Sequence, residues 1–186
     1  MAHFAVIDTE TNWNDSVMSA GVVIADRDTF ETAEKLYFVF SPEYKTGGMF
    51  SWKLPLEGRD FQKFVSSRKT ALDKIKAALE KYGVTEIFAY NALFDKNHLP
   101  ELAAYTWYDI MKIAAYRQYN DKIPPCTECF STGRMKRSYG VEPMMRMLSD
   151  NCRYEEEHNA LFDAADELEI MRLLGRDIDG YAAAKI

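Results

Sequence analysis

The sequence predicts a mixed α/β fold: a five-stranded sheet, with an antiparallel meander followed by parallel strands, flanked by helices. Three observations support this prediction. Three runs rich in apolar and β-branched residues occupy the first 40 positions, residues 70–82 repeat apolar side chains at helical spacing, and helices alternate with short apolar runs afterwards. Strands followed by helix–strand alternation are typical of a mixed sheet covered by helices.

The meander is predicted from His3–Glu10, Val17–Ala25 and Leu36–Phe40. The connections between these runs are too short for a crossover, so the strands should run antiparallel. Residues 41–66 contain prolines and glycines and show no clear period, which predicts a long loop with a short helix near Phe61–Val65.

The rest of the chain is predicted to hold the helices and two further strands. Apolar residues at i, i+3 and i+4 indicate a helix over Thr70–Tyr82, which Gly83 ends. The other predicted elements are a strand at Glu86–Tyr90, a helix at Asp95–Tyr105 interrupted by Pro100, a strand at Trp107–Tyr108, a helix at Ile110–Tyr119 capped by Asp109, a loop at 120–141, a short helix from Pro143 to Leu148, and a helix at Asn159–Leu174.

Length and composition predict one globular domain over residues 1–186, because 186 residues with 47% hydrophobic and 28% charged side chains suit a single core. No apolar run approaches the roughly 20 residues of a membrane span, and no signal peptide is visible, so we expect no membrane association. The three cysteines, Cys126, Cys129 and Cys152, are too few for a disulfide framework. This favours a reducing compartment and predicts a cytoplasmic protein.

The net charge of −6 argues at first against a polyanionic partner, but the charge is unevenly distributed. Residues 112–153 carry 8 basic and 4 acidic side chains, whereas residues 154–186 carry 3 basic and 9 acidic ones. A basic middle segment between acidic flanks leaves nucleic acid open as a partner, and it suggests that some of the acidic residues belong to a site.

Asp8 and Glu10 end the first predicted strand. Residues i and i+2 of a strand point to the same face, so this strand presents two carboxylates side by side. A divalent cation bound through oxygen ligands relieves their repulsion. The alternative is a solvated strand end, since an Asp-x-Glu pair arises readily by chance.

Asp95 follows the strand Glu86–Tyr90 closely, with Asn91 between them. If that strand lies beside the first one, Asp95 opens a helix near Asp8. The alternative is an ordinary acidic residue that caps a helix or interacts with its dipole.

Asp163 lies at the edge of the apolar face of the last predicted helix, where an acidic residue is costly unless it is paired or binds a metal. His158 precedes it by five residues, so the imidazole should come from just before the helix. A surface histidine after an acidic run is the alternative.

In combination and in this order, the three motifs resemble the DEDDh branch of the DnaQ-like 3′–5′ exonucleases, which have a ribonuclease H-like fold. Asp8-Thr9-Glu10 matches the Asp-x-Glu motif, Asn91 with Phe94-Asp95 matches the second motif, and His158 with Asp163 matches His-x4-Asp. The resemblance covers residues 4–174.

The resemblance implies two bound Mg²⁺ or Mn²⁺ ions held by Asp8, Glu10, Asp95 and Asp163, with His158 as the general base. Two such ions can activate a water and stabilise the leaving oxygen, and a histidine with a pKa near neutrality can accept the proton of the water. We expect substrate contacts from Thr9, Thr11, Asn91, Phe94, Arg134, Lys136 and Arg137.

The last three of these residues form a basic cluster in the 120–141 loop, which either binds phosphates or is simply solvated. Cys126 and Cys129 have the spacing of zinc ligands, but no second pair follows them, and incidental thiols are favoured over a zinc site.

These features predict a metal-dependent exonuclease that hydrolyses phosphodiester bonds at the 3′ ends of single-stranded DNA or RNA and releases nucleoside 5′-monophosphates. Replication or repair proteins are implied as partners, and the chain is expected to be a monomer or a homodimer. Two alternatives stay open: a non-catalytic nucleic-acid-binding or replication-accessory module on the same fold, and a zinc- or redox-regulated interaction domain built on the cysteine pair.

Overall fold

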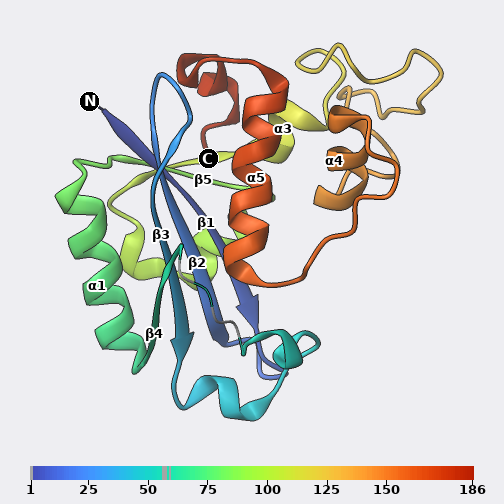
Figure 1. Ribbon diagram of the computed structural model, residues 1–186. Coiled ribbons are helices and arrows are strands. Elements are labelled where there is room, and N and C mark those ends of the chain that lie inside the picture. The colour runs from blue at the N-terminus through green and yellow to red at the C-terminus, as the bar shows by residue number, and fades with distance from the viewer. Residues whose placement is uncertain (1, 56–57, 59) are drawn as a thin grey trace.

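A six-stranded sheet forms the centre of the computed structural model, which describes residues 2–55, 58 and 60–186 (Figure 1). The strands lie in the order β4-β3-β2-β1-β5-β6. Their bounds are His3–Thr11 for β1, Val17–Asp26 for β2, Thr32–Phe40 for β3, Gln62–Ser66 for β4, Glu86–Ala89 for β5 and Thr106–Asp109 for β6. The pairs β1–β2 and β2–β3 are antiparallel, and β1–β5, β5–β6 and β3–β4 are parallel. The predicted mixed sheet is confirmed.

The sheet has one strand more than the five predicted, because Gln62–Ser66 is not a loop with a short helix near Phe61–Val65 but the edge strand β4. The apolar residues of this segment have helical spacing, yet the free edge of β3 offers backbone hydrogen bonds, and Phe64 stacks on Phe38 of β3. The rest of the predicted loop contains two short 3₁₀ helices, η1 (Glu43–Thr46) and η2 (Ser51–Lys53); residues 56, 57 and 59 lie outside the described residues.

The α-helices follow the predicted order, with shorter bounds in two places. They are α1 at Arg68–Lys81, α2 at Leu93–His98, α3 at Ile110–Ala114, α4 at Val141–Ser149 and α5 at Ala160–Leu174, with 3₁₀ helices η3 at Pro100–Leu102 and η4 at Ile178–Ala184. The helix predicted at Asp95–Tyr105 ends at His98, two residues before Pro100. The helix predicted to reach Tyr119 ends at Ala114, because the next residues pair with the 134–135 segment instead: Ala115 accepts a hydrogen bond from Met135.

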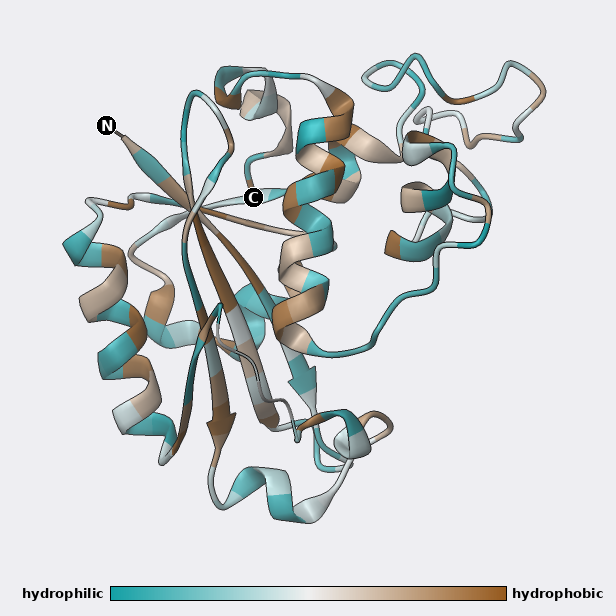
Figure 2. Ribbon diagram, in the orientation of Figure 1, coloured by the Kyte–Doolittle hydropathy of each residue, from teal (hydrophilic) through white to brown (hydrophobic). Residues whose placement is uncertain are grey.

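Helices cover both faces of the sheet and define two apolar clusters. Phe4 and Val6 of β1 pack with residues of α3, α4 and α5 on one face, and Ala5 and Ile7 pack with residues of α1 on the other. In Figure 2 the central strands are coloured largely as hydrophobic, in agreement with these two clusters. The first cluster lies under α5, so any side chain that continues the Phe4–Val6 series along β1 faces that helix.

Among the described residues, no helix combines the length and the apolar character needed to cross a membrane.

Candidate active site

Asp8 and Glu10 continue the series of β1 side chains that face α5. Phe4 and Val6 of the same series are fully buried under that helix, and alternation along the strand places the two carboxylates on the same face. Asp8 is paired across the ladder with Gly21 of β2. The acidic pair therefore lies near the centre of the sheet, at the end of β1 where apolar packing gives way to polar groups.

Gly21 allows the first turn of α5 to approach the sheet beside Asp8. A Cβ atom at this glycine would lie only 2.1 Å from the carbonyl oxygen of Ala160, the first residue of α5. The backbones of β2 and α5 are thus in direct contact. This contact places Asp163, in the first turn of α5, over the carboxylates of β1.

The structure brings Asp8, Glu10 and Asp163 together, with one carboxylate oxygen from each lying within 4.8 Å of the others. Asp163 is 4% exposed, and its Oδ1 atom is buried without a hydrogen-bond partner among the described residues. A buried, unpartnered carboxylate oxygen is costly unless a cation or a donor satisfies it. Three converging oxygens of this kind are suitable ligands for a divalent cation.

Asp95 reaches the same end of the sheet from the neighbouring strand. β5 lies beside β1 in parallel, and Asp95 sits in the first turn of α2, shortly after β5 ends. Its Oδ1 accepts hydrogen bonds from the Thr9 amide at 3.0 Å and from the Thr9 hydroxyl at 2.7 Å. The residue between Asp8 and Glu10 therefore anchors Asp95.

Burial raises the pKa of each of the four carboxyl groups. The pKa of Glu10 and that of Asp95 rise to about 7, the pKa of Asp163 rises to about 8, and the pKa of Asp8 lies well above its usual value. Burial is the largest cause throughout, and the negative charge of neighbouring carboxylates adds to it for Asp8, Glu10 and Asp163. A bound cation would favour the ionised form of all four groups near neutral pH.

His158 lies just before α5, separated from its first residue by the N-cap Asn159, whose side chain accepts from the Leu161 amide. The backbone of His158 has a positive φ of 52°. A ring nitrogen of His158, a carboxylate oxygen of Glu156 and one of Asp163 lie within 4.8 Å of one another. The imidazole is also stacked on Phe50. Asp163 thus belongs to two groups of potential metal ligands. One contains Asp8 and Glu10 of β1, and the other contains Glu156 and His158.

The four residues expected to contact substrate near the carboxylates differ in position. Thr9 is 5% exposed, and its amide and its hydroxyl both donate hydrogen bonds to Asp95. Thr11 is half-buried at the end of β1. Asn91 is exposed, and its amide donates to Asp109 at 2.9 Å. Phe94 is 39% exposed beside Asp95.

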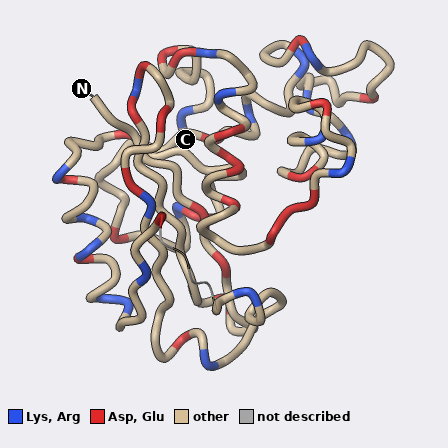
Figure 3. Tube along the Cα trace, in the orientation of Figure 1, with Lys and Arg blue, Asp and Glu red and all other residues tan. Residues whose placement is uncertain are grey.

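The basic cluster of Arg134, Lys136 and Arg137 lies apart from the carboxylates. Figures 1 and 3 show its loop beyond α4, away from the start of α5 where His158 and Asp163 are found. Lys136 and Arg137 are exposed, and the Arg134 guanidinium lies over the rings of Phe130 and Tyr139. The structure therefore brings the acidic and histidine residues together but leaves this cluster separate.

The cysteine pair shows no sign of a metal site. Cys126 is exposed and Cys129 half-buried, and both are free thiols. Within residues 2–55, 58 and 60–186, no group of three histidine, cysteine or acidic ligand atoms within 4.8 Å includes a cysteine.

Sequence reasoning did not identify Glu167, a further carboxylate buried near the site. It is 1% exposed, and its Oε2 atom has no hydrogen-bond partner among the described residues. Its pKa is raised well above the usual value, first by burial and then by the charge of Asp95. Because Glu167 follows Asp163 by four residues, the i, i+4 spacing was a signal that could have revealed it. Glu156 and Phe50 carried no comparable signal.

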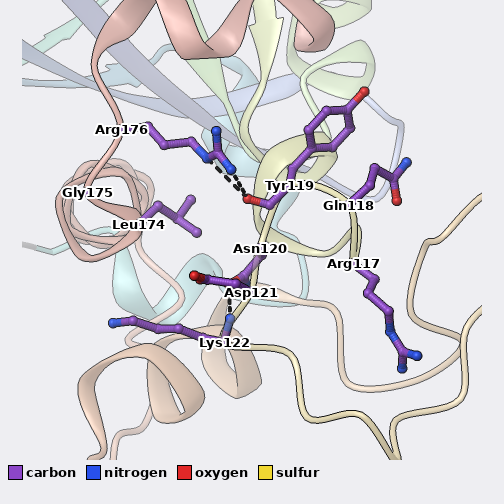
Figure 4. A pocket seen from close by; sticks show the side chains of 9 residues that line it. All are labelled: Arg117, Gln118, Tyr119, Asn120, Asp121, Lys122, Leu174, Gly175 and Arg176. Atoms are coloured by element: carbon purple, nitrogen blue, oxygen red, sulfur yellow. Dashed lines mark hydrogen bonds between the residues drawn. The ribbon is translucent and has the colours of Figure 1, made fainter.

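The molecule also has a polar cavity of about 370 Å³ near the C-terminal end of α5 (Figure 4). Its cationic side chains already bind backbone carbonyls: Arg176 donates to Tyr119, and Lys122 donates to Leu173 at 3.3 Å. The cavity does not include any of the site carboxylates.

No protein-family model matches this sequence, and a comparison with curated proteins finds no match either. Solved structures do match. One is a 3′-exonuclease in 3′-end-specific recognition of histone mRNA stem-loop, with 18% identity, a TM-score of 0.62, and coverage of 96% of this chain and 83% of that one. Another is a full-length 3′-exonuclease, with 17% identity, a TM-score of 0.61, and coverage of 99% and 89%.

A third similar structure is the nuclease domain of 3′hExo, a DEDDh family member, bound to rAMP. It is 15% identical, has a TM-score of 0.61, and the match covers 96% of this chain and 93% of that one. At sequence identities this low, the structural similarity establishes the fold alone. The chain has the fold of the DEDDh 3′–5′ exonucleases, over nearly its whole length.

Proposed function

We propose that this protein is a metal-dependent 3′–5′ exonuclease that hydrolyses phosphodiester bonds at the 3′ ends of single-stranded DNA or RNA and releases nucleoside 5′-monophosphates. The observation that carries the proposal is the position of Asp163, which lies within 4.8 Å of both the Asp8–Glu10 pair and His158. Hydrolysis of a phosphodiester needs charge stabilisation and a proton acceptor next to each other, and this arrangement supplies both.

Asp8, Glu10, Asp95 and Asp163 would hold two Mg²⁺ or Mn²⁺ ions. The fit rests on the unpartnered Oδ1 of Asp163 and on four carboxyl pKa values that burial raises, both of which a cation would relieve. When bound, such ions supply the positive charge that acidifies a water and offsets the charge of the phosphate.

His158 would take up the proton of the attacking water. One of its ring nitrogens lies within 4.8 Å of a carboxylate oxygen of Asp163 and of one of Glu156. Thr9 holds Asp95 by two hydrogen bonds, which keeps that carboxylate in place.

Exposed aromatic side chains next to the site carboxylates support a single-stranded substrate. Trp13 is 67% exposed three residues after Glu10, and Phe94 and Phe162, each adjacent in sequence to a site aspartate, are 39% and 38% exposed. Bases stack on such rings without sequence preference. RNA belongs among the candidates because similar structures involve an RNA stem-loop and rAMP.

The setting of the protein is part of the same proposal. Three free cysteines suit a reducing cytoplasmic compartment. A monomer or homodimer that works on nucleic acid 3′ ends with replication or repair proteins remains our expectation, and the distant basic cluster would contact the more distal part of a longer strand.

The test is incubation with 5′-labelled single-stranded DNA and RNA of equal sequence in Mg²⁺ and in Mn²⁺. We expect a ladder that shortens from the 3′ end, nucleoside 5′-monophosphate as product, and no reaction in chelator. Asp163→Asn serves as the inactive control. Binding of both strands without any cleavage in either metal would contradict the proposal and favour the non-catalytic binding module.

A further inference from the structure

We propose that Glu156, His158 and Asp163 form a second metal site, which takes Zn²⁺ and switches the proposed exonuclease off. One ligand atom from each of the three residues lies within 4.8 Å of the others. The group is distinct from the Asp8–Glu10–Asp163 group and shares only Asp163 with it.

The donor set is the basis for selectivity. Mg²⁺ prefers an all-oxygen shell and dehydrates reluctantly, whereas Zn²⁺ binds imidazole nitrogen and carboxylate oxygen together. A histidine and two carboxylates supply three protein ligands, and a water completes the four-coordinate shell typical of zinc. The three ligand atoms lie within 4.8 Å of one another, and zinc binding would draw them closer together.

His158 is free to bind a metal in the plane of its ring. Phe50 covers a face of the imidazole, with ring centroids 4.1 Å apart and an interplanar angle of 11°. Metal ligation uses the ring edge, so the stack orients the imidazole without blocking its nitrogens. Neither ring nitrogen has a hydrogen bond to any residue that the structure describes, so zinc would displace no protein partner.

Glu156 is half-buried and equally free at its carboxylate. Its backbone amide donates to Glu142 Oε2 at 3.1 Å, which fixes the main chain at this position. Within the described part of the chain, its side chain forms no hydrogen bond or ion pair. The neighbouring Glu157, in contrast, pairs with Lys53 at 3.0 Å, and Glu155 is exposed.

Asp163 contributes a further observation. It is 4% exposed, and its Oδ1 atom is buried without a hydrogen-bond partner among the described residues. Asp163 is a member of both groups, so a cation bound in either group could satisfy this atom.

Inhibition follows because Asp163 and His158 also belong to the proposed catalytic machinery, and this part rests on the proposed function. Zinc at this site occupies the lone pair with which His158 would accept a proton. It also draws Asp163 away from the catalytic cations. Zn²⁺ should therefore inhibit in the presence of Mg²⁺, with Glu156 setting the sensitivity.

The direct test is titration of the metal-free protein with Zn²⁺ by calorimetry, in a Cys126→Ser, Cys129→Ser, Cys152→Ser background that removes competing thiols. We expect Glu156→Gln and His158→Ala each to weaken zinc binding about tenfold or more. Glu155→Gln, the same change at an exposed neighbour, should bind zinc like the background protein. Equal zinc affinity in the Glu156→Gln, Glu155→Gln and background proteins would overturn the site.

The second measurement is exonuclease rate in fixed Mg²⁺ against rising Zn²⁺, with each variant referred to its own rate without zinc. We expect the half-inhibiting zinc concentration to rise about tenfold in Glu156→Gln and to stay unchanged in Glu155→Gln. Zinc binding that depends on Glu156 in a protein without nuclease activity would uphold the site and overturn the proposed function alone. Inhibition unaltered by Glu156→Gln would overturn the regulatory role.

Discussion

The ring of Phe50 lies parallel to the imidazole of His158, with ring centroids 4.1 Å apart and an angle of 11° between the planes. Phe50 comes from the connection between β3 and β4, immediately before η2, and His158 comes from the segment before α5. Two segments more than 100 residues apart in sequence thus meet at the histidine. The stack limits rotation of the imidazole and leaves its ring edge toward Asp163.

Phe50→Leu should lower kcat about 10- to 100-fold with little change in KM, because the imidazole loses its fixed orientation but the substrate contacts remain. Steady-state kinetics on a short single strand measure this. The ring protons of His158 should also lose their ring-current shift in the NMR spectrum. Phe64→Leu, which removes a ring stacked on Phe38 of β3 far from the site, is the matched control. An unchanged kcat together with an altered His158 spectrum would show that orientation does not matter.

His158→Ala should lower kcat by about 10²–10⁴-fold, the usual contribution of a positioned general base. The acidic limb of the pH–rate profile should weaken as well, because a protonated imidazole cannot accept a proton. Affinity for Mg²⁺, measured by calorimetry, should change little, since hard cations are held by oxygen ligands. A variant with the original rate and the same acidic limb would remove His158 from the mechanism.

Asp163→Asn should abolish measurable turnover, at least about 10³-fold, because the amide keeps the shape but not the charge. In metal-free protein at pH 9 the same change should raise Tm, since it removes a buried charge whose pKa of about 8 shows that ionisation opposes folding. Asp73→Asn, at an exposed position on α1, should leave both quantities unchanged. Lower Tm in Asp163→Asn at pH 9 would contradict this account.

The metal-free protein should lose stability as the pH rises from about 4 to about 8. In the folded state the pKa values of Glu10 and Asp95 are about 7 and that of Asp163 about 8, whereas unfolded carboxyl groups titrate near pH 4. The folded state therefore binds more protons across this interval, and the free energy of unfolding falls with rising pH. Urea unfolding in chelator measures the trend, and Mg²⁺ or Mn²⁺ should reverse it at pH 8. A rise in stability across the interval, or no effect of either cation, would count against a cation site.

Gly21→Ala should destabilise the protein by about 1–3 kcal/mol or more, since its Cβ would lie 2.1 Å from the Ala160 carbonyl oxygen and the two backbones must separate. Activity should fall as well, because the same contact places Asp163 over Asp8. Thermal unfolding and kcat are the measurements. Gly140→Ala introduces the same methyl at a position where Cδ of Pro143 is 4.0 Å away, and should cost about 0.5 kcal/mol or less.

The sequence alone determined the local parts of this protein. Hydrophobic runs, helical periodicity and stop signals such as Gly83 act within a few residues, so five of the six strands and the order of the α-helices were predicted from them. Asp8, Glu10, Asp95 and Asp163 were singled out by their places at strand ends and helix starts, and the resemblance to the DEDDh exonucleases joined them with His158 into one site.

Tertiary structure decided everything that depends on contacts between distant segments. β4 forms because β3 has a free edge to pair with, which no property of residues 62–66 reveals. The positions of Glu156 and Phe50 beside His158, and the separation of the basic loop from the carboxylates, depend on how α5 packs on the sheet at Gly21. Such contacts are set by shape and backbone approach between segments far apart in the chain, and local sequence patterns carry no record of them.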